Sequence, residues 1–180
     1  MYVELILGCM MSGKSTEMLR RMHRRLCLAA HKILYVRPST DNRHDITHDK
    51  KTIMVETCVV THLMEIVEKA REYDAVFIDE VQFFEDARAF LIHVEERPAR
   101  LSYLAFSGLS GDSERKPWPV ITELIPLVDN MTFKKALCVK CGDGQEASFS
   151  KCRVEKGDKI LIGDSKMYTP VCRKHFKDDI

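Results

Sequence analysis

The chain has 180 residues, about the size of one globular domain, which typically holds about 100–200 residues. Hydrophobic residues make up 45% and charged residues 31%, a composition typical of folded soluble proteins that argues against a disordered or fibrous chain. The formal net charge is +1 and the longest apolar run is Leu26 to Ala30, so we expect neither bulk nucleic-acid binding nor a membrane span, which needs about 20 apolar residues.

The seven cysteines are interpreted together with the start of the chain. No basic segment followed by an apolar stretch opens the sequence, so we expect no secretory leader and no disulfides. We therefore place the protein in the cytoplasm and interpret its paired cysteines first as metal ligands.

Short apolar strands alternate with helical segments along most of the chain. Predicted strands cover Tyr2 to Leu7, Lys32 to Val36, Ile53 to Val55, Ala75 to Ile78 and Leu101 to Phe106. Predicted helices cover Ser15 to Ala30, His62 to Glu72 and Asp86 to Glu96, and the polar stretch from Pro38 to Lys51 predicts a surface loop. This alternation predicts an α/β fold in which helices cover both faces of a parallel sheet.

The character of the sequence changes after about Thr132. Periodicity fades, while cysteine, glycine and charged residues become more frequent. We therefore predict two units, a main domain of residues 1–132 and a lobe of residues 133–180 that is too small to be stable through its own core.

The first predicted strand runs into a phosphate-binding motif. The segment Gly8-Cys9-Met10-Met11-Ser12-Gly13-Lys14-Ser15 matches G-x-x-x-x-G-K-[ST], with a strand before it and a helix after it. Its backbone N–H groups would surround the phosphates of ATP, Lys14 would bind the β and γ phosphates, and Ser15 would bind Mg²⁺.

Two acidic residues, Asp79 and Glu80, follow the apolar strand that ends at Ile78. A carboxylate at this position serves Mg²⁺ in P-loop proteins. Neighbouring side chains at a strand end point apart, so one of the two acids can serve the metal and the other can take a proton from an attacking hydroxyl. The alternative is a helix cap or a solvated acidic pair.

Two knuckles of metal-ligand type lie in the C-terminal lobe. Cys138 and Cys141 form one pair, and Cys172 and His175 form the other. Four such ligands suit a structural, tetrahedral Zn²⁺ that holds together a lobe with little core. The alternatives are buried thiols beside a surface histidine, or Cys152 in place of one ligand.

These motifs occur in one order together with Asp79 to Phe84, Arg115 to Trp118 and Tyr168. In this combination the chain resembles type II thymidine kinases from Val3 to about Phe176. The resemblance implies a RecA-like P-loop domain with a zinc-stapled C-terminal lasso lobe. It implies ATP-dependent phosphorylation of thymidine and deoxyuridine in pyrimidine salvage for DNA synthesis, with Glu80 as base. It also implies a homotetramer or dimer with feedback inhibition by dTTP.

The resemblance further implies a nucleoside site. The matching base-pocket positions are Met10, Phe83, Leu109, Trp118 and Tyr168. The backbone from Tyr168 through Thr169 and Pro170 to Val171 would grip the nucleoside, and Asp41 and Arg43 match a family segment near the phosphates and sugar.

One departure concerns the base pocket. Ser113 stands where the family usually has an aromatic residue, which leaves the accepted range of nucleosides open. Trp118 either supplies a larger face to the base or packs the loop against the sheet.

Two other functions compete with a kinase. Arg20, Arg21, Arg24 and Arg25 on one helix, together with a zinc lobe, would suit a nucleotide-driven nucleic-acid protein, although aromatic residues are not interleaved there. A P-loop switch without catalysis is the third hypothesis. The near-neutral charge and the Met and aromatic pocket positions favour the kinase.

Overall fold

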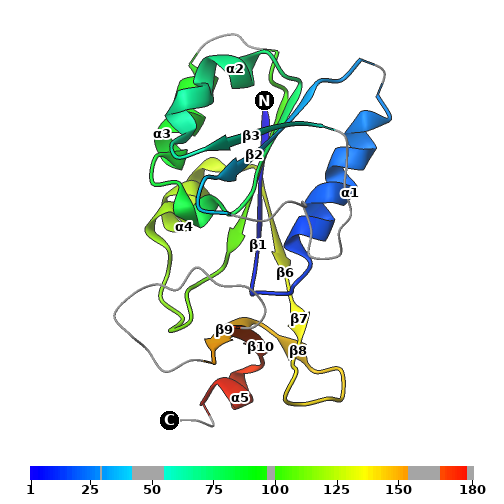
Figure 1. Cartoon of the computed structure of the whole chain (residues 1–180), viewed down its shortest axis with the longest axis vertical. Coiled ribbons are helices and arrows are strands. Elements are labelled where there is room, and N and C mark those ends of the chain that lie inside the picture. The colour runs from blue at the N-terminus through cyan, green and yellow to red at the C-terminus, as the bar shows by residue number, and fades with distance from the viewer. Residues whose placement is uncertain (29, 42–54, 97–99, 154–166, 178–180) are drawn as a thin grey trace.

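The computed structural model describes residues 1–28, 30–41, 55–96, 100–153 and 167–177. Its main part is a six-stranded parallel sheet with the strand order β3-β2-β4-β5-β1-β6 (Figure 1). The strands are β1 (Tyr2–Gly8), β2 (Ile33–Pro38), β3 (Glu56–Val60), β4 (Ala75–Ile78), β5 (Tyr103–Leu109) and β6 (Asn130–Lys134). The predicted α/β fold with a parallel sheet is confirmed.

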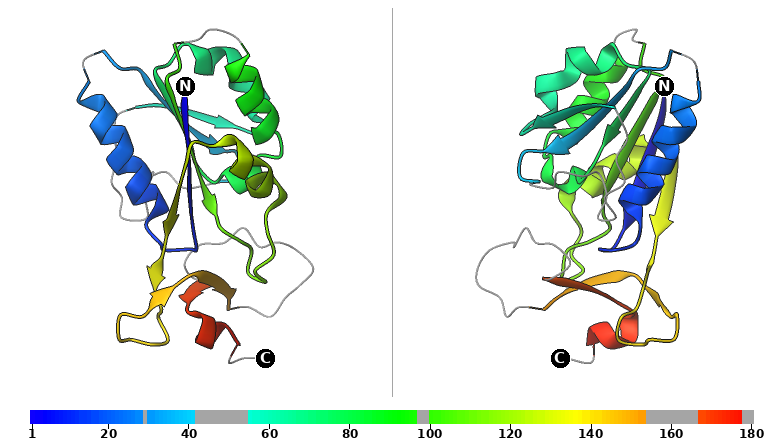
Figure 2. Two further views of the ribbon diagram at one scale, coloured as in Figure 1. Left: turned by 180° about the vertical axis from the view of Figure 1, so that it is seen from behind. Right: turned by 45° about the vertical axis from the view of Figure 1, so that its right-hand side comes forward.

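Helices cover both faces of this sheet. Helix α1 (Lys14–Leu26) lies on one face, and α2 (Val67–Arg71), α3 (Ala87–Glu95) and α4 (Pro119–Leu124) lie on the other (Figures 1 and 2). Three short 3-10 helices complete the main part, η1 (Leu63–Ile66), η2 (Val81–Phe83) and η3 (Ile125–Leu127).

Each face of the sheet has its own apolar core because side chains alternate along a strand. Ile6 of β1 packs with Met18 and Met22 of α1, whereas Leu5 belongs to the cluster that contains Phe90 of α3. All five side chains are fully buried, so both layers pack against strand β1, which leads to the phosphate loop.

Some predicted boundaries were wrong. The helix predicted to run to Ala30 ends at Leu26, where the apolar face stops and Leu26 and Leu28 become exposed. The helix predicted from His62 is broken at Ile66, whose φ of −119° is not helical, so η1 and α2 are separate. Strand β5 continues to Leu109 because it pairs with β1 as far as Gly8.

Several sequence predictions lie outside the described residues. They are Arg43, most of the polar stretch from Pro38 to Lys51, and Ile53 of the strand predicted from there to Val55. Within the part of the chain that the structure describes, no helix has the length and apolar character of a membrane span.

The C-terminal lobe lies beyond the carboxyl ends of the parallel strands β1 and β6 (Figure 1). It contains two antiparallel strand pairs and a short helix, namely β7 (Ala136–Leu137) with β8 (Glu146–Ala147), β9 (Phe149–Cys152) with β10 (Tyr168–Val171), and α5 (Arg173–Lys177). Strand β6 pairs with β1 through Lys134, so it runs across the predicted boundary after residue 132. The division into residues 1–132 and 133–180 stays a prediction.

Candidate active site

The phosphate loop connects β1 to α1 and has the backbone that its glycines permit. Gly13 has a φ of +80° and Met11 a φ of +59°, both in the left-handed region. A Cβ at Gly8 would lie 2.5 Å from the carbonyl oxygen of Lys134 and 2.4 Å from Ser12 Oγ, so a side chain does not fit there. The loop can therefore curl tightly before the first turn of α1.

Polar groups of this loop suit an anion. The Lys14 side chain is buried, and its Nζ donates a hydrogen bond of 2.9 Å to the Cys9 carbonyl oxygen. Ser12 Oγ is also buried and has no hydrogen-bond partner among the described residues. Ser15 is half-buried in the first turn of α1, where the helix dipole favours negative charge. The predicted roles of Gly8 to Ser15 in phosphate binding remain predictions.

The loop is also attached to the C-terminal lobe. The Met10 N–H donates a 2.9 Å hydrogen bond to Ser150 Oγ of β9, and the Cys9 thiol donates to the Ala147 carbonyl oxygen at 3.3 Å. Cys9 belongs to the apolar cluster of the lobe, and burial raises the pKa of its thiol, which therefore stays neutral. Sequence analysis assigned no role to Ser150, because this contact joins residues 140 positions apart.

The two acidic residues lie directly after β4. Asp79 is fully buried and accepts hydrogen bonds from the Tyr35 hydroxyl at 3.1 Å and from the Glu80 N–H at 3.0 Å. Glu80 has a left-handed backbone with φ 50° and ψ 44°, a conformation that costs a non-glycine residue about 1–3 kcal/mol and recurs at functional sites. The division of roles between Asp79 and Glu80 stays a prediction.

Gln82 connects the ends of two strands. Its Nε2 donates a 2.6 Å hydrogen bond to Glu80 Oε2, and its Oε1 accepts one of 3.0 Å from the Leu109 N–H at the end of β5. The side chain is buried, so these contacts fix the direction of the Glu80 carboxylate. Gln82 lies within the segment Asp79 to Phe84 that carries the family resemblance, but the sequence alone assigned no role to it. A polar residue two positions after Glu80 was the available signal.

The predicted base-pocket residues come from several elements. The rings of Phe83 and Trp118 make an edge contact with centroids 6.2 Å apart, and Trp118 also packs against the main core. Tyr168 begins β10; burial, then the neighbouring Cys152 and Asp112, raise the pKa of its hydroxyl. The loop that carries Asp112 and Trp118 therefore lies close to the lobe.

The remaining predicted nucleoside residues that the structure describes lie in β10 or shortly after β2. Thr169, Pro170 and Val171 are buried in β10, where Pro170 is opposite Ser150 of β9. The Asp41 N–H donates to the Pro38 carbonyl oxygen at 3.0 Å. Arg43 lies outside the described residues, and no contact in the structure tests the nucleoside roles of the others.

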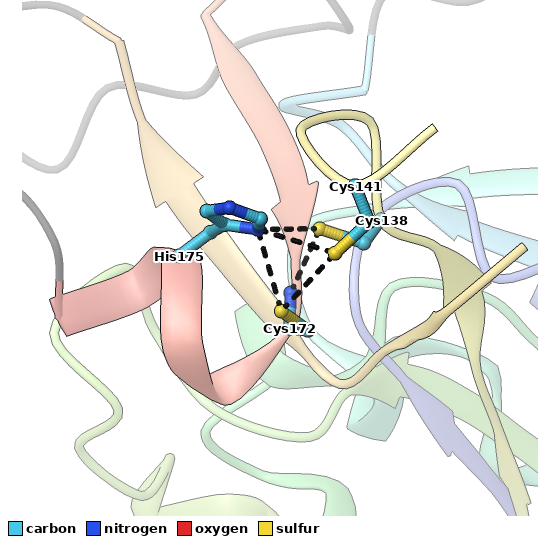
Figure 3. A group of neighbouring side chains, drawn as sticks. All are labelled: Cys138, Cys141, Cys172 and His175. Atoms are coloured by element: carbon cyan, nitrogen blue, oxygen red, sulfur yellow. Dashed lines mark hydrogen bonds between the residues drawn. The ribbon is translucent and has the colours of Figure 1, made fainter. Parts of the chain in front are cut away.

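The four predicted metal ligands lie together between the first knuckle and α5 (Figure 3). Their ligand atoms all lie within 4.8 Å of one another. His175 Nδ1 is 3.5 Å from the sulfur of Cys138, 3.3 Å from that of Cys141 and 3.5 Å from that of Cys172. A tetrahedral zinc with ordinary bond lengths separates nitrogen and sulfur ligands by about 3.6 Å, so the cluster has the size of a metal site.

The chemistry of these ligands also fits a divalent cation. Burial would raise the pKa of the Cys138 thiol, but hydrogen bonds from the Cys172 backbone and the His175 ring lower it to about 6. Burial, and then the neighbouring sulfurs of Cys138 and Cys172, raise the pKa of Cys141 to about 12. Full ionisation of such close thiols needs a shared positive charge, which a metal ion supplies.

A phosphate loop after β1 and a carboxylate pair after β4 lie at the same edge of one parallel sheet. This arrangement is typical of P-loop nucleotide-binding proteins. The chain belongs to the thymidine kinase family, because the family model for thymidine kinase matches residues 1–176.

Curated relatives agree with this assignment over almost their whole length. The chain is 38% identical over 181 residues to the thymidine kinase of Vaccinia virus (strain Western Reserve), covering 98% of this chain and 97% of the relative. It is 39% identical over 182 residues to that of Variola virus and 37% identical over 181 residues to that of Monkeypox virus (strain Zaire-96-I-16), with the same coverage.

Proposed function

We propose that the protein transfers the γ-phosphate of ATP to the 5′-hydroxyl of thymidine, and of deoxyuridine, with Glu80 as the general base. The observation that carries this proposal is the position of the two motifs. Gly8 of β1 pairs with Leu109 of β5. Ile78, the last residue of β4 before the acidic pair, pairs with Phe106 of the same strand. Only strand β5 therefore lies between the strands that lead to the two motifs, and those strands reach positions three residues apart along it.

The residues of the chain have distinct tasks in this reaction. The Lys14 ammonium neutralises charge on the β and γ phosphates, and Ser15 and Asp79 would hold Mg²⁺, which lowers the charge of the transferred group. Glu80 accepts the proton of the 5′-hydroxyl as the oxygen attacks the γ-phosphorus, which gives dTMP and ADP. Gln82 holds the Glu80 carboxylate in one direction through the 2.6 Å hydrogen bond.

The metal cluster supports a structural role. Cys138, Cys141, Cys172 and His175 would hold Zn²⁺ with no ligand position left open for substrate. The lobe has a small core, so the metal would fix β10 and α5 in place. Residues Tyr168 to Val171 would then close over the nucleoside and exclude water from the phosphate, which limits ATP hydrolysis.

The family resemblance supports further properties. These are a homotetramer or homodimer, a cytoplasmic location, and feedback inhibition by dTTP. Sedimentation velocity determines the oligomer, and inhibition of thymidine phosphorylation by micromolar dTTP tests the feedback.

A panel of nucleosides with ATP and Mg²⁺, scored for monophosphate formation, tests the proposed function. We expect product from thymidine and deoxyuridine, and absence of product from both would refute the proposal. DNA-stimulated ATP hydrolysis would instead support the nucleic-acid hypothesis. The structure gives that hypothesis less support, because Arg20 and Arg21 pair with Glu17 and Arg25 lies over the Tyr103 ring.

A further inference from the structure

Two neighbouring aromatic rings on the C-terminal lobe form a surface that cationic side chains contact. Phe149 of β9 and Phe176 of α5 lie with ring centroids 5.5 Å apart. Phe176 directly follows the metal ligand His175, and the two rings come from different elements of the lobe. The position of this ring pair therefore depends on how α5 is held.

Three cations lie over these rings, and one of them comes from the main domain. Arg173 lies over Phe149 at 5.1 Å, and Lys151 lies over Phe176 at 5.7 Å; both cations belong to the lobe itself. The Arg115 guanidinium is 4.5 Å from the Phe176 centroid and 5.6 Å from that of Phe149. Among the described residues, Arg115 is the one cation that reaches the pair from outside the lobe, within the range of a cation–π interaction.

Hydrogen bonds from Asp112 order the turn that carries Arg115. The Asp112 carboxylate accepts hydrogen bonds of 2.8 Å from the N–H groups of both Glu114 and Lys116, and the Arg115 N–H donates to the Asp112 carbonyl oxygen at 3.1 Å. Arg115 has a φ of +67°, which is unfavourable for a long side chain. The contact with Phe149 and Phe176 is an interaction that offsets this conformation.

We propose that Arg115 is a positioning residue that couples the metal-binding lobe to the loop carrying Trp118. With the metal ligands in place, His175 holds the neighbouring Phe176 in position. The rings of Phe176 and Phe149 then bind the Arg115 guanidinium through cation–π contacts. The loop from Ser110 to Trp118 is thereby held against the lobe as a wall of the nucleoside site, so the inference rests on the proposed function. Ser113, in the same loop, is too small to anchor it, and Arg115 supplies that anchor from two residues further on.

Three variants separate this role from general stability. Arg115→Asn removes the cation but keeps a residue that tolerates a left-handed backbone. Arg115→Lys keeps the cation. Arg173→Ala is the matched control, because it removes a cation from Phe149 without breaking a link between the lobe and the main domain. Metal content is measured for each variant, so that loss of the metal is recognised.

Acrylamide quenching of Trp118, the single tryptophan of the chain, reports the loop without any turnover. We expect quenching in the Arg115→Asn variant to rise to the level of the parent after its metal is removed with a chelator. Arg115→Lys and Arg173→Ala should resemble the untreated parent. Adding Phe176→Leu to Arg115→Asn should produce no further rise, since both changes break the same contact.

Kinetics give the second measurement. We expect Arg115→Asn to raise the thymidine KM about fivefold, equivalent to about 1 kcal/mol, with the ATP KM and metal content unchanged. Quenching and thymidine KM like those of the parent in Arg115→Asn would overturn the proposal, as would equal effects from Arg173→Ala. If the parent does not phosphorylate thymidine, the proposed function fails, while the quenching series still decides whether Arg115 couples the loop to the lobe.

Discussion

The substitution Glu80→Gln tests the proposed base with little disturbance of its surroundings. The new amide keeps an oxygen where Glu80 Oε2 accepts the 2.6 Å hydrogen bond from Gln82, so the bridge to Leu109 can persist. A hydrogen bond to a charged group is replaced by a neutral one, which costs about 1 kcal/mol of stability, or about 2–4 °C in Tm for a chain of this size.

The kinetic effect should be much larger than this change in stability. A positioned base contributes about 10²–10⁴-fold to the rate, equivalent to about 2.7–5.4 kcal/mol of barrier. We therefore expect kcat for thymidine phosphorylation to fall by at least about a hundredfold. Binding of ATP, measured by calorimetry, should change by less than about threefold because the phosphate loop is untouched.

Glu85→Gln is the control for this experiment. It makes the same chemical change five residues further along the chain, at an exposed side chain outside the site. Both variants and the parent are compared by single-turnover product formation and by thermal unfolding. A Glu80→Gln variant that phosphorylates thymidine within about threefold of the parent would show that Glu80 is not the base.

Three further predictions follow from other parts of the molecule. Cys138→Ser should lower Tm and raise the thymidine KM, and mass spectrometry should find one zinc per parent chain; a fully active, zinc-free parent would contradict it. Trp118→Ala should raise the thymidine KM at least about tenfold, since base–aromatic contacts are worth about 1–3 kcal/mol. Normal kinetics in that variant, with parent emission unchanged by thymidine, would exclude Trp118 from the pocket. Arg20 and then Arg21 lower the pKa of Glu17 from 4.5 to about 2, so its charge stabilises the fold above about pH 4.5. Urea unfolding should show that the Glu17→Gln destabilisation shrinks as pH falls toward 2; a pH-independent difference would refute this.

The sequence predicted the parts of the fold and site that depend on local pattern. Strand β4 and the acidic pair after it, and the phosphate loop between strand and helix, lie where the pattern indicated. Helix α4 was not predicted, although Pro119 at its first position was an available signal. Strand β6 was also missed, because its place in the sheet depends on pairing with β1 about 126 residues away.

The contacts between the lobe and the main domain could not be predicted for the same reason. The hydrogen bond from Met10 to Ser150 and the contact of Arg115 with Phe176 join residues that are close only after folding. The left-handed backbone of Glu80 and Arg115 also has no local signal, since neither residue is glycine. Resemblance to a family implies roles for residues, whereas these positioning contacts form only in the folded chain.

The place of β1 in the sheet has a consequence for biosynthesis. This first strand pairs only with β5 and β6 among the described strands, whereas β2 pairs with β3 and β4. A ribosome adds about 5–20 residues per second, so the strand that leads to the phosphate loop waits about 5–20 s for residues 103–109 to be made. During that interval Leu5, Ile6 and Leu7 lack the partner strands beside which they are buried in the folded protein. Nucleotide binding should accordingly arise only after β5 and β6 have been made.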